Sequence, residues 1–141
     1  MQTNDFKVAL VPCNGIGRLV STVVREAARR VQEMRPDQVV VLASCALAVQ
    51  DECQLTDFGR YPVVVIDGCR PHCSSVLASE LGKEPAARVY VPDVMAKHKI
   101  AIAGEKRRGL TKRGYQLVEA VAAEAVEQID RIIADEMLAV L

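Results

Sequence analysis

Four short runs of the chain are apolar at nearly every position, and stretches with helical periodicity separate them. The runs cover residues 7–13, 38–45, 61–69 and 87–93. A strand with one face in water alternates apolar and polar residues, whereas a strand covered on both faces is apolar throughout. Such runs alternating with helices indicate parallel strands joined by right-handed crossovers. We therefore predict a three-layer α/β fold with a mostly parallel sheet.

The segments between these runs predict the helices. An apolar helical stripe covers residues 19–31 and ends before Pro36. A short helix is expected within residues 46–55. Another runs from Pro71, which suits a first helical turn, to a stop signal at Gly82. A long amphipathic helix closes the chain, with a start expected near residue 111.

Composition narrows the class of protein. The 141 residues predict one domain over 1–141, with enough length to bury an aliphatic core. Lys and Arg number 18 and so do Asp and Glu, which gives no general argument for nucleic-acid or membrane binding. No apolar run reaches the roughly 18 residues of a membrane span, and the first residues lack a signal-peptide layout. We therefore expect a cytoplasmic protein, in which five cysteines favour metal binding or thiol chemistry over disulfides.

Four of the cysteines are expected at one edge of the sheet. Cys13, Cys45 and Cys69 each end a successive predicted strand, and Cys73 lies at the start of the next helix. In a flavodoxin-like strand order 2-1-3-4, which we favour, Cys13 lies on the middle one of three adjacent strands. Strands lie about 4.8 Å apart, close to the separation of two sulfurs that share one zinc ion. A metal site is feasible there, while thiol redox or sulfur-transfer chemistry and simple packing remain alternatives.

The motifs around these cysteines resemble the DGC-domain family. The matching elements are "PCNGIG" after the first strand, "SC" at Ser44 and Cys45, "IDGCRPHC" at residues 66–73, and the strand that ends in "VPDV". The resemblance covers most of the chain. It implies that Cys13, Cys45, Cys69 and Cys73 bind zinc, and it implies little about the biological role.

Four thiolates around Zn²⁺ carry a net charge near −2, so positive groups are expected nearby. Gly15 and Gly68 let backbone N–H groups approach sulfur, and Arg18 and Arg70 bring positive charge. We expect Asp67 either to brace the turn by accepting backbone N–H bonds or to accept a hydrogen bond next to the ligands.

The same surroundings would lower the pKa of a thiol in metal-free protein. We therefore expect Cys13 or Cys73 to be reactive without zinc. This supports the alternative of a redox or sulfur-transfer enzyme that uses Cys69 and Cys73, or Cys13.

A weaker alternative is an anion-binding loop like that of low-molecular-weight phosphatases. Such a loop places a strand-end cysteine and an arginine around a phosphate, as Cys13 and Arg18 do here. The loop of this chain is one residue shorter than that motif requires, so the phosphatase-like reading has little support.

The remaining polar residues carry weaker signals. Cys53 is expected to be a surface or helix-packing thiol, and His72 a solvated or capping residue instead of a ligand. His98 lies in the basic segment 97–113, which is expected to be a solvated loop with a short strand at 100–103. The segment could alternatively dock an acidic partner or a small anion. Aromatic residues are sparse there, so RNA recognition is not expected.

Overall fold

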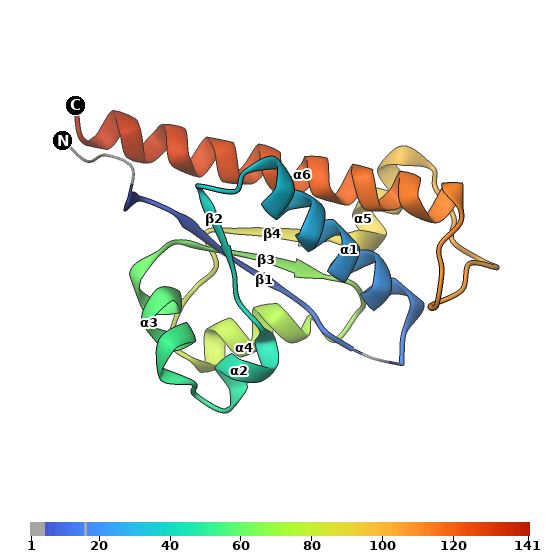
Figure 1. Cartoon of the computed structure of the whole chain (residues 1–141), viewed down its shortest axis with the longest axis horizontal. Helices are drawn as coiled ribbons and strands as arrows, with labels where there is room; N and C mark the ends of the chain where they lie inside the picture. The colour runs from blue at the N-terminus through green and yellow to red at the C-terminus, as the bar shows by residue number, and fades with distance from the viewer. Residues whose placement is uncertain (1–4, 16) are drawn as a thin grey trace.

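The sheet is parallel throughout and has the predicted strand order. The computed structural model describes residues 5–15 and 17–141, and within them four strands form one sheet in the order β2-β1-β3-β4 (Figure 1). The strands are β1 (Val8–Pro12), β2 (Val39–Val41), β3 (Val63–Asp67) and β4 (Ala87–Tyr90).

The register aligns the carboxyl ends of the three strands that precede the motif cysteines. Ala9 of β1 pairs with Val40 of β2 on one side and with Val63 of β3 on the other. All pairings are parallel, so β1, β2 and β3 end at the same edge of the sheet. This edge is where open α/β sheets bind their ligands.

Helices cover both faces, which confirms the three-layer arrangement (Figure 1). One face carries α1 (Leu19–Met34), α5 (Val91–His98) and α6 (Lys112–Ala139). The opposite face carries α2 (Ser44–Ala48), α3 (Glu52–Arg60) and α4 (Cys73–Glu80). The long helix α6 begins at the predicted place and packs along α1.

The two faces explain why the strands are apolar at every position. Val8 and Leu10 of β1 belong to the core under α1 and α6, whereas Ala9 and Val11 belong to the core on the opposite face. All of these side chains are at most 1% exposed. Burial of both faces replaces the alternating pattern of a half-exposed strand with a continuous apolar run.

Some strand ends and helix starts differ from the sequence prediction. β2 ends at Val41, so Cys45 lies in the first turn of α2 instead of at a strand end. β4 ends at Tyr90, and Pro92 lies in the first turn of α5. Proline is tolerated there because N–H groups of the first helical turn have no partner within the helix. In the described part of the chain, residues 100–103 form no strand.

The helix after the third strand begins later than expected. His72 adopts a left-handed conformation with φ of 52°, so α4 begins at Cys73 and not at Pro71. The helix ends at Glu80, and Gly82 follows with φ of 86°, as its predicted role as a stop signal requires. Across residues 5–15 and 17–141, no helix combines the length and the apolar character that crossing a bilayer demands.

Candidate functional site

The four motif cysteines all follow the carboxyl ends of adjacent strands. Cys13 comes directly after β1, and Cys69 lies in the turn after β3. Cys73 is the first residue of α4, and Cys45 lies in α2, which contacts α4. The predicted common edge is therefore present, although Cys45 reaches it from a helix.

Cys13 is the buried member of the set. Its side chain is only 5% exposed, and its sulfur accepts hydrogen bonds from the backbone N–H of Gly68 and from the hydroxyl of Ser21. Ser21 itself is buried in α1. The interactions link the end of β1 to the turn after β3 and to the first turn of α1. Sequence reasoning missed Ser21, although its position early in the helix after Cys13 was a usable signal.

Burial raises the pKa of the Cys13 thiol above its ordinary value. The negative charge of Asp67 raises this pKa further, and the donors Gly68 and Ser21 oppose these effects without cancelling them. The prediction that Cys13 or Cys73 is reactive without zinc is therefore not supported at Cys13, and for the pair it stays a prediction. Burial of the sulfur away from water raises the pKa by more than the two hydrogen-bond donors lower it.

Asp67 caps helix α4 from the end of β3. Its carboxylate is 2% exposed and accepts the backbone N–H of Ser74 at 2.8 Å and that of Ser75 at 3.2 Å. The Ser75 hydroxyl donates a further bond of 2.6 Å. Asp67 thus braces the turn, the first of the two expected roles. The bonds hold the segment that carries Cys69 and Cys73 against the sheet.

His72 extends this arrangement toward the last strand. Its Nδ1 lies 3.7 Å from Oδ2 of Asp67, and its ring stacks on Tyr90 of β4 with centroids 4.4 Å apart. The side chain is 42% exposed. His72 is thus partly solvated and occupies the N-cap position of α4, in line with the predicted solvated or capping residue.

Two glycines permit the close approach of α1 to the cysteine loops. A Cβ atom on Gly68 would lie 2.8 Å from Cγ2 of Val20 and 3.2 Å from Cγ2 of Val24. A Cβ on Gly15 would lie 3.0 Å from the Ser21 hydroxyl. Gly68 needs to be a glycine because side chains of α1 occupy the space that its own side chain would fill, and at Gly15 a side chain would press on the Ser21 hydroxyl.

The structure brings some of the thiols together and leaves others apart. Cys13 and Cys69 lie close enough for their charges to interact, whereas Cys45 and Cys73 are exposed. Within residues 5–15 and 17–141, no three His, Cys, Asp or Glu side chains are grouped so that they could hold a metal ion. Cys53 is an exposed residue of α3, as expected for a thiol outside the motif.

The phosphatase-like reading falls partly outside the described residues, because the loop contains Ile16. Arg18 is exposed and serves as the N-cap residue of α1. A different pair of arginines lines a cavity together with Cys13. Arg25 and Arg29, which sequence reasoning overlooked, project from one face of α1 into a cavity of about 260 Å³ that Cys13 also lines. Their spacing of four residues along the predicted helix was the available signal.

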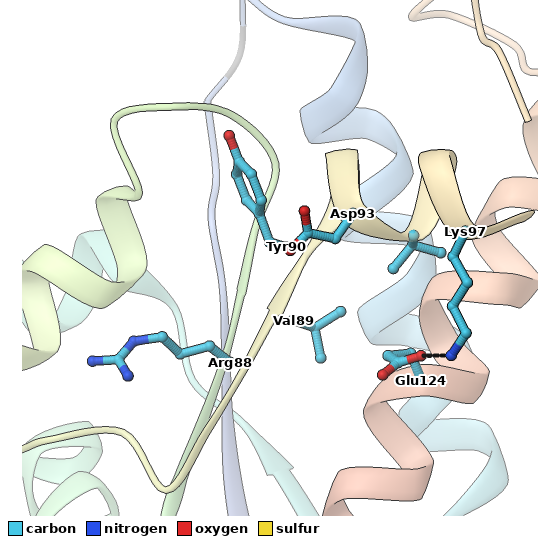
Figure 2. Close-up of a pocket in the computed structure, with 7 residues that line it drawn as sticks. Arg88, Val89, Tyr90, Asp93, Lys97 and Glu124 are labelled. Atoms are coloured by element: carbon cyan, nitrogen blue, oxygen red, sulfur yellow. Dashed lines mark hydrogen bonds and ion pairs between the residues drawn. The ribbon is translucent and has the colours of Figure 1, made fainter. Parts of the chain in front are cut away.

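A smaller cavity of about 110 Å³ lies beside β4 and α5. Figure 2 shows two of its lining residues, Lys97 and Glu124, joined by their ion pair of 3.4 Å, while Tyr90 and Arg88 point in other directions. No cysteine lines this cavity. We therefore place the candidate site at the cysteine edge.

The basic segment 97–113 is partly helical and makes intramolecular hydrogen bonds and ion pairs, whereas a solvated loop was expected. Its first residues form the end of α5, where His98 occupies the last turn. Arg113 donates to the carbonyl of Ala103 at 2.6 Å and lies 3.8 Å from the carboxylate of Glu105. Intramolecular pairs thus account for part of the positive charge.

A comparison with family models gives a match to the DGC domain over residues 9–113. This range runs from β1 to the start of α6 and contains all four motif cysteines together with Asp67 and Gly68. No curated protein matches the chain. The family match covers well over half of the sequence, and the chain therefore belongs to the DGC-domain family.

Proposed function

We propose that this protein binds a zinc ion through Cys13, Cys45, Cys69 and Cys73. The observation that carries the proposal is the strand order, which sets β1 between β2 and β3 and so sends the four cysteines to one edge. Thiolates are preferred ligands of zinc, and four of them complete its tetrahedral shell. A zinc ion would supply the positive charge that offsets the repulsion between neighbouring thiolates.

The residues around the buried thiol suit such a donor set. Cys69 lies within range for its charge to act on the Cys13 thiol, and Gly68 and Ser21 supply hydrogen-bond donors to the Cys13 sulfur. Such donors stabilise a thiolate once a metal has displaced its proton. Asp67 holds the turn between Cys69 and Cys73 through its bonds to α4. Binding requires the exposed Cys45 and Cys73 to turn toward the first two sulfurs.

Thiol redox chemistry by Cys69 and Cys73 is the second candidate. Cys73 is exposed at the first residue of α4, and the His72 N–H donates to the Cys69 carbonyl at 3.0 Å, so the two cysteines bracket one tight turn. In this reaction the two thiols form a disulfide and lose two protons and two electrons to a disulfide substrate, which becomes two thiols. Zinc would mask these thiols, so metal content separates the two proposals.

The basic segment is a secondary candidate for an acidic partner or a small anion. Lys106 and Arg108 are exposed in the turn closed by the bridge between Lys106 and Gly109. The carbonyl of Arg107 accepts a bond of 3.4 Å from the Thr22 hydroxyl, which links this turn to α1 near the cysteine edge. Exposed positive charge at this place would attract an anion approaching that edge.

The test is competitive zinc titration of anaerobically purified protein, with metal content measured by elemental analysis. Serine in place of Cys13, Cys45, Cys69 or Cys73 should each weaken zinc binding greatly, because a hydroxyl is a poor substitute for a soft thiolate. Cys53→Ser is the matched control and should leave the affinity unchanged.

Equal losses for Cys53→Ser and Cys69→Ser would refute the ligand assignment. Protein that contains no metal and forms a Cys69–Cys73 disulfide under mild oxidation would favour the redox candidate. Because the aliphatic core is large, we expect the chelated protein to stay folded, and circular dichroism after chelation checks this.

A further inference from the structure

We infer that the cavity beside Cys13 binds a small molecule that carries a carboxylate or phosphate group. The cavity has a volume of about 260 Å³ and lies between the loop after β1, helix α1 and the connection from β2 to α2. The inference goes beyond zinc binding, because Cys13 enters it only as one wall of the cavity. It concerns Arg25, Arg29 and Gln54, none of which is a proposed zinc ligand.

The charge of the lining favours an anion. Arg25 and Arg29 line the cavity, and no Asp or Glu does. The whole chain, in contrast, carries as many acidic as basic residues. A cavity with a local excess of positive charge attracts ligands of the opposite sign.

Neither arginine is strongly neutralised. Arg25 donates to the Gly15 carbonyl at 3.4 Å and to the Thr22 hydroxyl at 3.3 Å, and across residues 5–15 and 17–141 it has no carboxylate partner. Arg29 lies 3.8 Å from the carboxylate of Glu33, and both side chains are well exposed. Exposed pairs of this kind are weak. Both guanidinium groups are therefore able to bind an external anion.

The neutral polar residues add donors. The side-chain oxygen of Gln54 accepts the Ala43 N–H at 2.7 Å, which leaves the NH₂ group of its amide as the donor available to a ligand. Arginine likewise offers only donors, in a planar fork that matches the oxygens of carboxylate and phosphate. A ligand rich in acceptor oxygens satisfies this set.

The remaining walls set the size and the position of the ligand. Pro12, Ala28, Val41 and Leu42 form apolar surface, suited to a short carbon skeleton. The volume is close to the lower limit of roughly 300 Å³ for small-molecule pockets, which suits a metabolite-sized ligand. A ligand held by the arginines would lie next to the Cys13 sulfur, at the edge where such folds bind ligands.

Two probes test the inference on zinc-free, full-length protein. Inorganic phosphate and acetate are titrated separately, with chloride at equal ionic strength as the blank, and backbone amide shifts are followed by NMR. We expect saturable shifts at Cys13, Ser44 and Gln54. Tighter binding of phosphate would indicate a phosphate-bearing ligand, and tighter binding of acetate a carboxylate.

Substitutions identify the binding groups. Arg25→Gln and Arg29→Gln should each weaken binding of the tighter probe about tenfold, the usual effect of losing a charged hydrogen bond. Arg131→Gln removes the same charge from α6, outside the cavity, and should change nothing. Arg29→Gln guards against a folding defect in Arg25→Gln, because Arg29 is well exposed and its ion pair is with the exposed Glu33.

Absence of saturable shifts with both probes would overturn the inference, as would unchanged binding in both arginine variants. Zinc affinity is measured on the same proteins. Weaker zinc binding in Arg25→Gln without any anion binding would mean that the arginine offsets thiolate charge, and the inference would fail while the zinc proposal stands. Anion binding that survives in Cys45→Ser after zinc binding is lost would support the inference alone.

Discussion

Replacing Gly68 with alanine tests why a glycine precedes Cys69. The added methyl group would lie 2.8 Å from Cγ2 of Val20 and 3.2 Å from Cγ2 of Val24, well inside the normal carbon contact distance of about 3.5 to 4.0 Å. Its distance of 3.4 Å from the Cys13 sulfur is tolerable. The clash is therefore between the turn after β3 and helix α1.

Relief of the clash has a definite cost. Val24 is fully buried, and a valine in a helix has one strongly preferred rotamer, so α1 must shift or a side chain must leave its rotamer. Overpacking of this kind costs about 1–3 kcal/mol. The lower entropy of alanine in the unfolded chain returns about 0.4–1 kcal/mol. The net loss in the free energy of unfolding should be about 1.3 kcal/mol, the difference between the midpoints of these two ranges.

Urea unfolding followed by circular dichroism measures this loss as a lower midpoint with an unchanged slope. Gly59→Ala is the control, because Gly59 lies in α3 and a Cβ there would meet no atom within 4 Å. That change should raise stability by about 0.5–1 kcal/mol. A Gly68→Ala protein as stable as the parent would show that α1 does not pack rigidly on the motif.

Two further predictions concern Asp67 and Cys13. Asp67→Asn should lower the free energy of unfolding by about 1–3 kcal/mol. The buried carboxylate accepts three hydrogen bonds, and asparagine replaces one of its two acceptor oxygens with an NH₂ group that can only donate. Asp51→Asn, which affects one exposed capping bond of 3.1 Å, should cost less in the same urea assay, and equal losses would contradict the prediction. For Cys13, both folded and unfolded states keep the thiol protonated at neutral pH. Above its ordinary pKa of 9.0 the unfolded state ionises first, because the folded pKa is raised, so stability should fall as pH rises. Urea midpoints against pH should fall less steeply in Cys13→Ala, and an identical slope would refute this.

The layered fold was predictable because burial on both sides leaves a direct trace in sequence. The run from Val63 to Ile66 has no polar residue, and in the structure both of its faces lie against helices. The amphipathic stripe of α6 similarly reports its single buried face. Such patterns reflect which side chains avoid water, a property that each segment carries locally.

The ends of elements were harder to predict, because they depend on contacts with distant residues. Nothing local required His72 to adopt a left-handed conformation, which the structure pairs with stacking on Tyr90. Cys45 looked like a strand residue from its apolar neighbours, yet β2 ends at Val41. In the turn from β2 into α2, the Ala43 N–H donates to the side-chain oxygen of Gln54, a residue of α3 that lies eleven positions later in the chain.

By itself, then, the sequence determined the layers, the parallel sheet and the edge of the sheet that the four cysteines follow, because strand direction and burial follow from periodicity and order along the chain. Only the tertiary structure decided the environment of each thiol. Cys13 is buried with a raised pKa while Cys45 and Cys73 are exposed, and Arg25 and Arg29 join Cys13 around one cavity. Desolvation and the meeting of separate segments depend on how α1 packs against the sheet, and no single segment encodes that packing.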